Sequence, residues 1–293
     1  MTSPVPGRPA SPAGSGVAAI STVYAAESAR AGGTWCSIIS APGDEPIVED
    51  RPDQVVHGYS IQKIALAAAV LDKIDRGDLA LGHRVTLTAD DVIGGSGIYH
   101  LQTIWDDTVT VAGFLTAMLL VSDNTAVRLC ARVAPPTEIN ATLAAKGFTR
   151  TRVEPAGDRF FLGVTTPRET TDLLTRLATG DLLSPASTTF MLSILRSAGG
   201  YHDGVRRTMS SVDRHRVATK HGADFDTTGA ARHEAGIVFA PDGRPRLTYA
   251  MFARALPDHD NYGATHPAVE AHAAIGRTML GHLPPAPAGP GTA

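Results

Sequence analysis

Apolar residues recur at three- and four-residue steps along several stretches of the chain, which is the pattern of amphipathic helices. The clearest stretch runs from Ser60 to about Arg76, and the sequence RGD that follows predicts a helix end at Gly77. One face of this helix carries Ile61, Ile64, Ala68, Leu71 and Ile74. The pattern therefore places Ser60 in the first turn of a helix.

Further helices are predicted on both sides of a short polar break. The segment TVAGFLTAMLLVSDNTAVRLCARVA holds an apolar run up to Val121, the break SDN, and a second helix from about Thr125. The sequences SPASTTFMLSILRSA and THPAVEAHAAIGRTMLGHL are also amphipathic, and we expect the second of them to pack on a sheet. SDN is thus predicted to be a loop between two helices.

Strand-forming runs flank the helical region. TWCSIIS precedes it, RLTYAMFARAL lies near the end, and VATKHGADFDTTGAARHEAGIVFA has the pattern of two strands around a polar turn. This order predicts an α/β (α+β) fold, with a helical lobe of about residues 59–197 inserted into an α/β lobe of about residues 17–58 and 198–283. Residues 1–16 and 284–293 are poor in large apolar residues, and we expect disordered tails there.

Composition favours one globular domain over residues 17–283, because 43% of the residues are hydrophobic and only 19% are charged. The 26 basic and 29 acidic residues form no basic block, which argues against nucleic acid or an anionic membrane and favours a small-molecule substrate. No apolar run reaches the ~20 residues of a membrane helix, and the N-terminus lacks the pattern of a signal peptide. We therefore expect a cytoplasmic protein, with a monomer as the default expectation.

The two cysteines, Cys36 and Cys130, are too few for a disulfide framework. They either form one disulfide or remain as buried thiols, and the sequence leaves both options open. The histidines show no metal-ligand spacing with acidic or cysteine partners. We expect neither a metal nor a cofactor.

Ser60 and Lys63 lie about one helical turn apart, so the lysine amine can approach the serine hydroxyl. A serine needs a basic neighbour to become a nucleophile, and a helix N-terminus favours a developing oxyanion. Alone, this Ser-x-x-Lys spacing is weak evidence, and it favours an ordinary helix with a solvated lysine. Two further triplets, SDN at Ser122–Asn124 and KHG at Lys220–Gly222, favour the nucleophile.

Ser-x-x-Lys, Ser-Asp-Asn and Lys-x-Gly in this order are the motif set of serine β-lactamases and penicillin-binding proteins. The chain resembles a class A β-lactamase from roughly Val17 to Leu283, and SGIYHL, SDNTA and RHEAGIV agree with this resemblance. TRVEP, from Thr151 to Pro155, is similar to the Arg-x-Glu-Pro loop of class A. The resemblance implies a β-lactamase-like fold, in which the sheet is mainly antiparallel and flanked by helices.

The resemblance also implies catalytic roles. Ser60 would attack the carbonyl carbon, and either Lys63 or Glu154 through a water would take its proton, a choice disputed for the family. The backbone amides of Ser60 and Ala223 would form the oxyanion hole. Ser122 would pass a proton to the leaving nitrogen, and Glu154 would hold the water that hydrolyses the acyl-enzyme.

The remaining roles concern substrate binding. Asn124 would bind the substrate amide and Lys63, and Lys220 would supply a positive field for the proton donor and for a substrate carboxylate. Tyr99 or Trp105 would form an aromatic wall at the entrance, although core packing is an equal alternative for both. All of these assignments come from the resemblance.

Two positions depart from the family. His221 stands where the family has a Thr or Ser whose hydroxyl binds the β-lactam carboxylate, and with Gly222 it is assigned to substrate binding. Its imidazole either pairs with a carboxylate when protonated, or turns away from the site, as strand alternation allows. EPAGD places Asp158 where the family has a water-holding asparagine, and a second carboxylate there would weaken Glu154 as a base.

Three functions fit these observations. The first is a hydrolase that opens a β-lactam or a related amide through a Ser60 acyl-enzyme. The second is a cytoplasmic esterase, amidase or acyltransferase on a metabolite, which the two departures and the missing signal peptide favour. The third is a protein that binds β-lactams without turnover. Fold alone does not separate these three.

Overall fold

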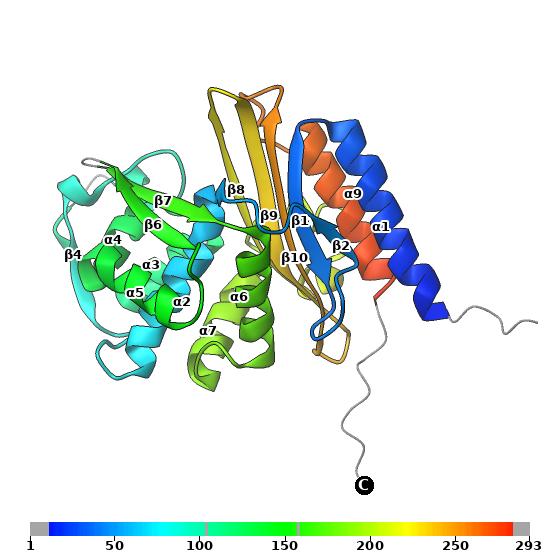
Figure 1. The fold of residues 1–293 in the computed structure, drawn as a ribbon. Coiled ribbons are helices and arrows are strands. Elements are labelled where there is room, and N and C mark those ends of the chain that lie inside the picture. Colours follow the sequence, from blue (N-terminus) through cyan, green and yellow to red (C-terminus); the bar gives the residue numbers. More distant parts are fainter. Residues whose placement is uncertain (1–11, 103–104, 157–158, 284–293) are drawn as a thin grey trace, which may run out of the picture.

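The computed structural model describes residues 12–102, 105–156 and 159–283. Its main sheet has five antiparallel strands in the order β2-β1-β10-β9-β8 (Figure 1). The strands are β1 (Thr34–Ser40), β2 (Val48–Asp50), β8 (Val217–Asp226), β9 (Gly229–Phe239) and β10 (Pro245–Leu256). Because β1 pairs with β10, the sheet joins segments from the two ends of the sequence, as the strand pattern predicted.

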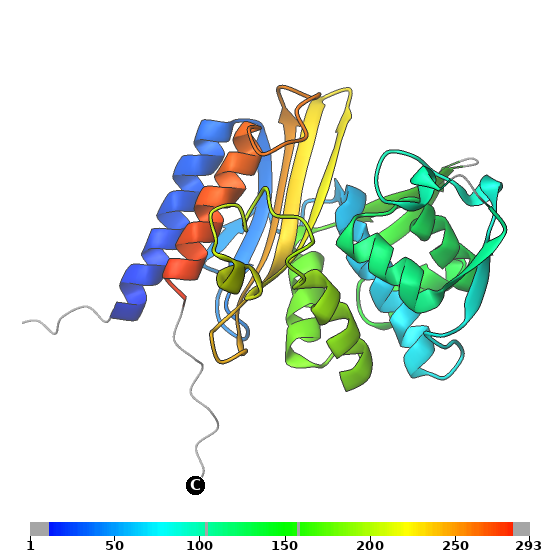
Figure 2. The ribbon, with the colours of Figure 1, turned by 180° about the vertical axis from the view of Figure 1, so that it is seen from behind.

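Helices cover both faces of this sheet. The first and last helices, α1 (Pro12–Ala31) and α9 (Pro267–Gly281), lie side by side on one face (Figures 1 and 2). On the opposite face α6 (Pro167–Thr179) packs against β1, β9 and β10. α6 therefore packs on the sheet, although it falls within the residues that we expected in the helical lobe.

Strand alternation separates two hydrophobic cores. Tyr249 and Met251 of β10 pack in the core beneath α1 and α9, whereas Ala250 and Phe252 pack in the core shared with α6 and the helical region. Successive side chains of a strand point to opposite faces, so an apolar strand such as β10 contributes to both cores at once. This explains why RLTYAMFARAL is apolar over nearly its whole length.

The second region of the molecule consists of helices with two small sheets. Its helices are α2 (Lys63–Asp75), α3 (Val111–Leu120), α4 (Thr125–Val133), α5 (Pro136–Ala145) and α7 (Pro185–Leu195). One small sheet pairs β4 (Arg84–Leu87) with β5 (Asp107–Thr110), and the other has the order β3-β7-β6, from β3 (Val56–His57), β6 (Arg152–Ala156) and β7 (Arg159–Thr165). The short helices of this region are η1 (Tyr59–Gln62), η2 (Ala89–Asp91) and η3 (Tyr99–Leu101). A fourth short helix, α8 (Ser211–Arg214), precedes β8.

The predicted helix at Ser60 is confirmed with one change. Ser60 lies in the 3₁₀ turn η1, and the α-helix proper begins at Lys63 and ends at Asp75. Gly77 follows with a φ of +84°, the conformation in which glycine commonly ends a helix. The SDN triplet lies between α3 and α4, as the polar break predicted.

Two segments differ from the expectation. α1 begins at Pro12, so residues 12–16, which we expected in a disordered tail, belong to a helix. The segment around TRVEP, expected as a loop, forms the antiparallel pair β6–β7 instead. Alternation of Arg152, Val153 and Glu154 between exposed and buried positions suits a strand with one buried face.

The two cysteines are free and buried. Cys36 lies in β1 and Cys130 in α4, and both are fully buried free thiols. The sulfur of Cys130 lies 3.7 Å from that of Met118, and burial raises the pKa of both thiols. Of the two options that the sequence left open, the structure therefore has the buried thiols.

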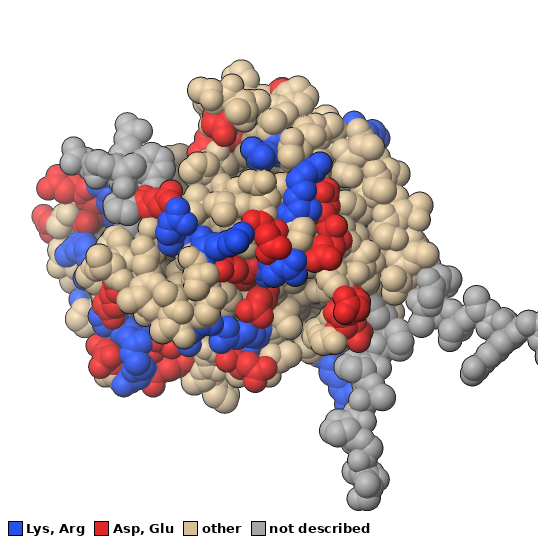
Figure 3. Space-filling model, in the orientation of Figure 1, with Lys and Arg blue, Asp and Glu red and all other residues tan. Residues whose placement is uncertain are grey.

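Charged side chains of both signs are intermixed on the face seen in Figure 3. Among the ion pairs of the described residues, Arg168 contacts Glu49 and Asp53, and Arg152 pairs with Glu154. Such mixing is typical of a solvated surface rather than of a polyanion-binding face. Within the described ranges, no helix has the length and apolar character needed to cross a membrane.

Candidate active site

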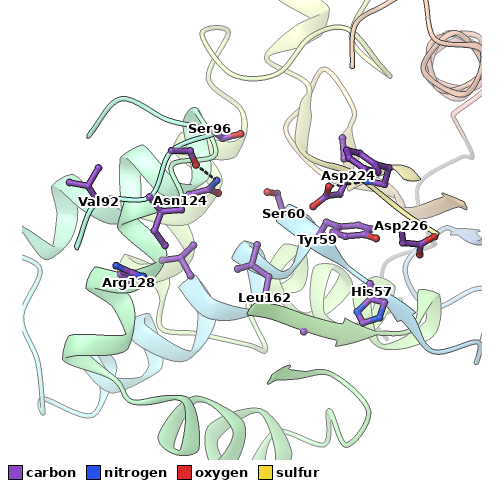
Figure 4. Close-up of a pocket in the computed structure, with 16 residues that line it drawn as sticks. His57, Tyr59, Ser60, Val92, Ser96, Asn124, Arg128, Leu162, Asp224 and Asp226 are labelled. Carbon is purple, nitrogen blue, oxygen red and sulfur yellow. Dashed lines mark hydrogen bonds between the residues drawn. The ribbon is translucent and has the colours of Figure 1, made fainter. Parts of the chain in front are cut away.

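A cavity of about 810 Å³ lies between the end of β8 and the helical region, and Ser60 lines it (Figure 4). Asn124 contributes to one side, Leu162 of β7 to another, and Ala223 and Asp224 of β8 to a third. Figure 4 shows the Ser60 side chain between Asn124 and Asp224. Residues far apart in the sequence therefore converge on one serine.

The backbone around Ser60 is tightly constrained. Tyr59, directly before it, has a φ of +45°, which is uncommon for a residue other than glycine and occurs often at functional sites. A Cβ added at Gly222 would lie 2.9 Å from the Gly58 oxygen and 3.1 Å from the Ser60 nitrogen. Glycine therefore allows β8 to approach η1 this closely, which gives the Lys-x-Gly motif a physical reason.

Lys63, the first residue of α2, is fully buried. Its Nζ donates to the Ser122 backbone oxygen at 2.6 Å, the Ser122 Oγ at 3.1 Å and the Asn124 Oδ1 at 2.8 Å. Burial lowers the pKa of Lys63 to about 7, and the nearby carboxylate of Asp123 opposes this shift. Near neutral pH a substantial fraction of this amine is therefore unprotonated and able to accept a proton.

The SDN loop is held by its central residue. Ser122 has a φ of +58°, and both its backbone and its hydroxyl oxygen face the lysine amine. The buried carboxylate of Asp123 accepts hydrogen bonds from the backbone nitrogens of Ile98 at 2.6 Å, Tyr99 at 2.9 Å and Ala126 at 2.9 Å. Asp123 thereby joins η3 and the residues before it to the start of α4.

Asn124 connects the same segment to the lysine. Its backbone nitrogen donates to the Ser96 oxygen at 3.1 Å, its Nδ2 donates to the Gly94 oxygen at 2.9 Å, and its Oδ1 accepts from Lys63. Gly97 has a φ of +104°, and a Cβ there would lie 2.2 Å from an Asp123 carboxylate oxygen. The segment that contains Gly94, Ser96 and Gly97 therefore packs directly on the SDN residues.

Lys220 lies in β8, which forms the wall of the site opposite the helical wall that carries Lys63. Its side chain is 2% exposed, and its Nζ donates to the backbone oxygen of His221 at 3.0 Å. Burial, together with the positive charge of Lys63, lowers the pKa of Lys220 well below its usual value. The two walls of the site thus each contribute one buried amine.

His221 is stacked against an aromatic ring. Its imidazole lies on Tyr201 with ring centroids 3.9 Å apart and an interplanar angle of 20°. Burial and the charges of Lys220 and Lys63 hold the pKa of His221 well below its usual value, so the ring is neutral at neutral pH. This weighs against pairing of an imidazolium with a carboxylate. It favours the alternative of a ring turned away, because the imidazole stacks on Tyr201 and does not line the cavity.

Glu154 lies in β6 with its side chain 38% exposed. Its carboxylate accepts a hydrogen bond from Arg152 at 2.5 Å, while Val153 between them is buried. The structure thus places Glu154 in an ion pair with Arg152, and the role as a base that the resemblance implies for it stays a prediction. Asp158, the second expected carboxylate, lies outside the described residues.

The two candidates for an aromatic wall belong to the core. Tyr99 is 6% exposed and Trp105 packs partly buried against the same hydrophobic cluster, and neither lines the cavity. The aromatic residues that do line the cavity are Tyr59 and Phe225, which sequence reasoning missed. Their positions next to Ser60 and at the end of the Lys-x-Gly strand are the signals that would have found them.

Further titratable groups surround the cavity. Figure 4 shows His57 and Asp226 on the same side of Ser60 as Tyr59. Burial, with the charges of Asp226 and Asp224, raises the pKa of Tyr59 to about 12, so this phenol stays protonated at neutral pH. Across the part of the chain that the structure describes, no group of three or more His, Cys, Asp or Glu side chains is arranged to hold a metal ion.

Comparisons with known proteins show which family and fold the chain resembles. The model of the β-lactamase enzyme family matches residues 18–283. A crystal structure of a β-lactamase from Sphaerobacter thermophilus is 26% identical, with a TM-score of 0.74 over 92% of this chain and 99% of that one. A β-lactamase from Xanthomonas campestris pv. campestris shares the fold: it is 21% identical, with a TM-score of 0.76 over 91% of this chain and 98% of that one. The structure of PBP-A also shares it, at 20% identity and a TM-score of 0.72 over 95% of this chain and 98% of that one.

Proposed function

Because the chain belongs to the β-lactamase enzyme family, we propose that it is a serine hydrolase that opens a β-lactam or a related amide through an acyl-enzyme on Ser60. The observation that carries this proposal is the buried amine of Lys63, three residues after a serine that lines a cavity. Three oxygens hold that amine, and its pKa of about 7 suits a proton acceptor at neutral pH.

Acylation begins with attack of the Ser60 Oγ on the substrate carbonyl carbon. The unprotonated amine of Lys63 accepts the hydroxyl proton as the new C–O bond forms. The carbonyl oxygen becomes an oxyanion, and the backbone amides of Ser60 and Ala223 are the donors proposed to stabilise it. The close approach of β8 to η1 at Gly222 supports this pairing of amides.

The tetrahedral intermediate then loses its nitrogen. The C–N bond breaks, and the nitrogen takes a proton from the Ser122 hydroxyl, which recovers one from the lysine ammonium 3.1 Å away. The net change is transfer of the serine proton to the leaving nitrogen. Asn124, which also accepts from Lys63, is proposed to bind the substrate amide, and Lys220 on the opposite wall is proposed to bind an anionic group of the substrate as an ammonium.

Hydrolysis of the acyl-enzyme requires a base for the attacking water. Water adds to the ester carbonyl, the base accepts its proton, and the Ser60 oxygen leaves and is reprotonated. We assign this base to Glu154 by its place in the Arg-x-Glu-Pro sequence, and its ion pair with Arg152 must open or rearrange for it to act. Deacylation is therefore the step that the observed geometry supports least directly.

A second candidate is an esterase, amidase or acyltransferase that acts on a metabolite through the same serine. It is favoured by His221, whose neutral ring stacks on Tyr201 and offers neither a hydroxyl nor a positive charge to a β-lactam carboxylate. The two candidates share the acyl-enzyme and differ in the group that is transferred and in its acceptor.

Intact-protein mass spectrometry with a panel of β-lactams tests the proposal. We expect a transient mass increase on Ser60 and release of hydrolysed product, while Ser60→Ala loses both the adduct and at least about 10⁴-fold in turnover. Thermal unfolding of the variant provides the control for an intact fold.

The other outcomes identify the alternatives. Full activity in folded Ser60→Ala excludes the mechanism. An adduct that persists for hours indicates β-lactam binding without turnover. No adduct with any member of the panel, in a protein with an unmodified Ser60, excludes a β-lactam substrate and leaves the metabolite hydrolase or transferase.

A further inference from the structure

Gln62, between the proposed nucleophile and Lys63, is a buried polar residue in an otherwise apolar stretch. Its side chain is 2% exposed. Its Nε2 donates to two backbone oxygens of the β6–β7 hairpin, that of Val164 at 2.7 Å and that of Arg152 at 3.2 Å. Both amide hydrogens are thus used, and they connect the nucleophile turn to a segment about 90 to 100 residues later in the sequence.

The two acceptors lie at an interruption in the hairpin. Arg152 faces Val164 in the ladder, and the next pair is Glu154 with Phe161, so Leu162 and Gly163 of β7 face the single residue Val153 of β6. This is a β-bulge, which disrupts the local ladder and leaves backbone groups without strand partners. Gly163 has the positive φ (+79°) typical of such a bulge.

The bulge projects into the proposed active site. Leu162 and Gly163, the two residues opposite Val153, both line the cavity beside Ser60. A Cβ at Gly163 would lie 2.1 Å from the Arg152 oxygen, so only glycine fits here, and its own oxygen accepts from the Gly58 nitrogen at 3.2 Å. The irregular part of the hairpin is therefore the part that meets the nucleophile turn.

A second side-chain amide holds the same bulge from the other side. Asn140 of α5 accepts from the Val153 nitrogen at 2.8 Å and donates to the Val153 oxygen at 3.0 Å. Val153 is 1% exposed, so without Asn140 both of its backbone groups would be buried and unpaired, which is costly. Two carboxamides thus hold the hairpin at and beside its bulge.

We infer that Gln62 and Asn140 form a clamp that fixes the β6–β7 bulge, and that Gln62 ties this cavity wall to the nucleophile turn as one rigid unit. Gln62 is a positioning residue in this arrangement. It holds Leu162 and Gly163 in the wall and sets the backbone next to Glu154. The inference rests on the proposed function for its kinetic consequence, whereas the clamp itself is a property of the fold.

Gln62→Met tests the clamp, because methionine keeps the length and removes both donors. We expect faster hydrogen exchange in peptides covering residues 152–165, and unchanged exchange in β8 and β9. Breakdown of the acyl-enzyme, followed by stopped flow with a chromogenic cephalosporin, should slow about tenfold, while its formation changes less than about threefold. Gln54→Met is the matched control, because Gln54 is exposed and donates only to the oxygen of the adjacent Val55.

Two further variants keep the test independent of one substitution. Asn140→Leu removes the other half of the clamp without touching the nucleophile turn, and it should give the same pattern of exchange and of rates. Gln62→Glu offers a donor only when its carboxyl is protonated. We compare Gln62→Glu with the wild type at each pH. As the pH falls, the hydrogen exchange of its β6–β7 hairpin and the rate at which its acyl-enzyme breaks down should both approach the wild-type values.

The outcomes separate the clamp from the proposed function. Unchanged exchange of the hairpin in both Gln62→Met and Asn140→Leu overturns the clamp. Equal losses in formation and breakdown of the acyl-enzyme overturn the positioning role, because they mean that Gln62 acts on Ser60 or Lys63 directly. If the wild type forms no acyl-enzyme, the proposed function fails, and the exchange measurement alone still decides whether the clamp exists.

Discussion

The two lysines of the site are equally buried but differently held. Lys63, on the helical wall, donates to three oxygens of the SDN loop, and its pKa is lowered to about 7. Lys220, on the strand wall, donates to the backbone oxygen of the next residue, and its pKa is lowered well below the usual value. The helical wall thus holds its amine with three acceptors, whereas the strand wall holds its amine with one.

Among the substitutions considered, removal of the Lys63 amine is expected to have the largest effect on the rate of acylation. Lys63→Ala should slow acylation by about 10²-fold or more, because it removes the proton acceptor and leaves the oxygens of Ser122 and Asn124 without their donor. Single-turnover kinetics with a chromogenic cephalosporin measures this. A loss below about threefold in a folded variant would show that the amine is only structural.

Lys220→Ala is expected to cost less, about tenfold in acylation. It removes the buried amine of the strand wall and leaves the proton acceptor of the helical wall intact. Lys73→Ala is the charge-matched control, because Lys73 pairs with Glu138 at the far end of α2. If Lys220→Ala were as damaging as Lys63→Ala, the division of roles between the two walls would be wrong.

The pH dependence of acylation tests the state of Lys63. Its free amine is the reactive form, so the rate should rise as the pH increases through about 7, by roughly tenfold between pH 6 and pH 8. Stability should follow the same direction. The unfolded lysine has the higher pKa and binds more protons between about pH 7 and 10.5, so this residue's contribution to stability increases with pH in that window. Acylation that is flat over this range would contradict the assignment of the base.

His221→Thr is expected to have the smallest effect. Because the imidazole is neutral and stacked on Tyr201, the substitution should change acylation less than about threefold and leave the pH profile unaltered. Steady-state kinetics with carboxylate-bearing β-lactams provides the measurement. A large gain with these substrates would show that the histidine had excluded a carboxylate, which would strengthen the case for a metabolite substrate.

The sequence predicted those features that local pattern encodes. The helix after Ser60 and the two strands around the KHG triplet follow from periodicity, because burial of one face of a helix or strand repeats along the segment itself. The convergence of Lys63, Ser122 and Asn124 came from the motif set rather than from periodicity.

Features that depend on distant partners were not predicted. TRVEP was expected as a loop from the family resemblance, whereas it forms a bulged hairpin held by Gln62 and Asn140. Neither side chain is recognisable in advance as a partner of a strand. The stacking of Tyr201 on His221 likewise joins two segments whose contact no local pattern encodes. For Tyr99 the sequence left the cavity entrance and the core open as equal alternatives, and its burial puts it in the core.

The pairing of β1 with β10 has a consequence for how the chain folds. β1 is synthesised early, but its central neighbour in the sheet, β10, leaves the ribosome only after the whole helical region. Contacts of such long sequence separation slow folding, and the edge of β1 toward β10 stays unpaired until then. We expect pulse-labelling exchange during refolding to protect α2 and α3 before β1, and the order in which these segments become protected would show whether the sheet closes last.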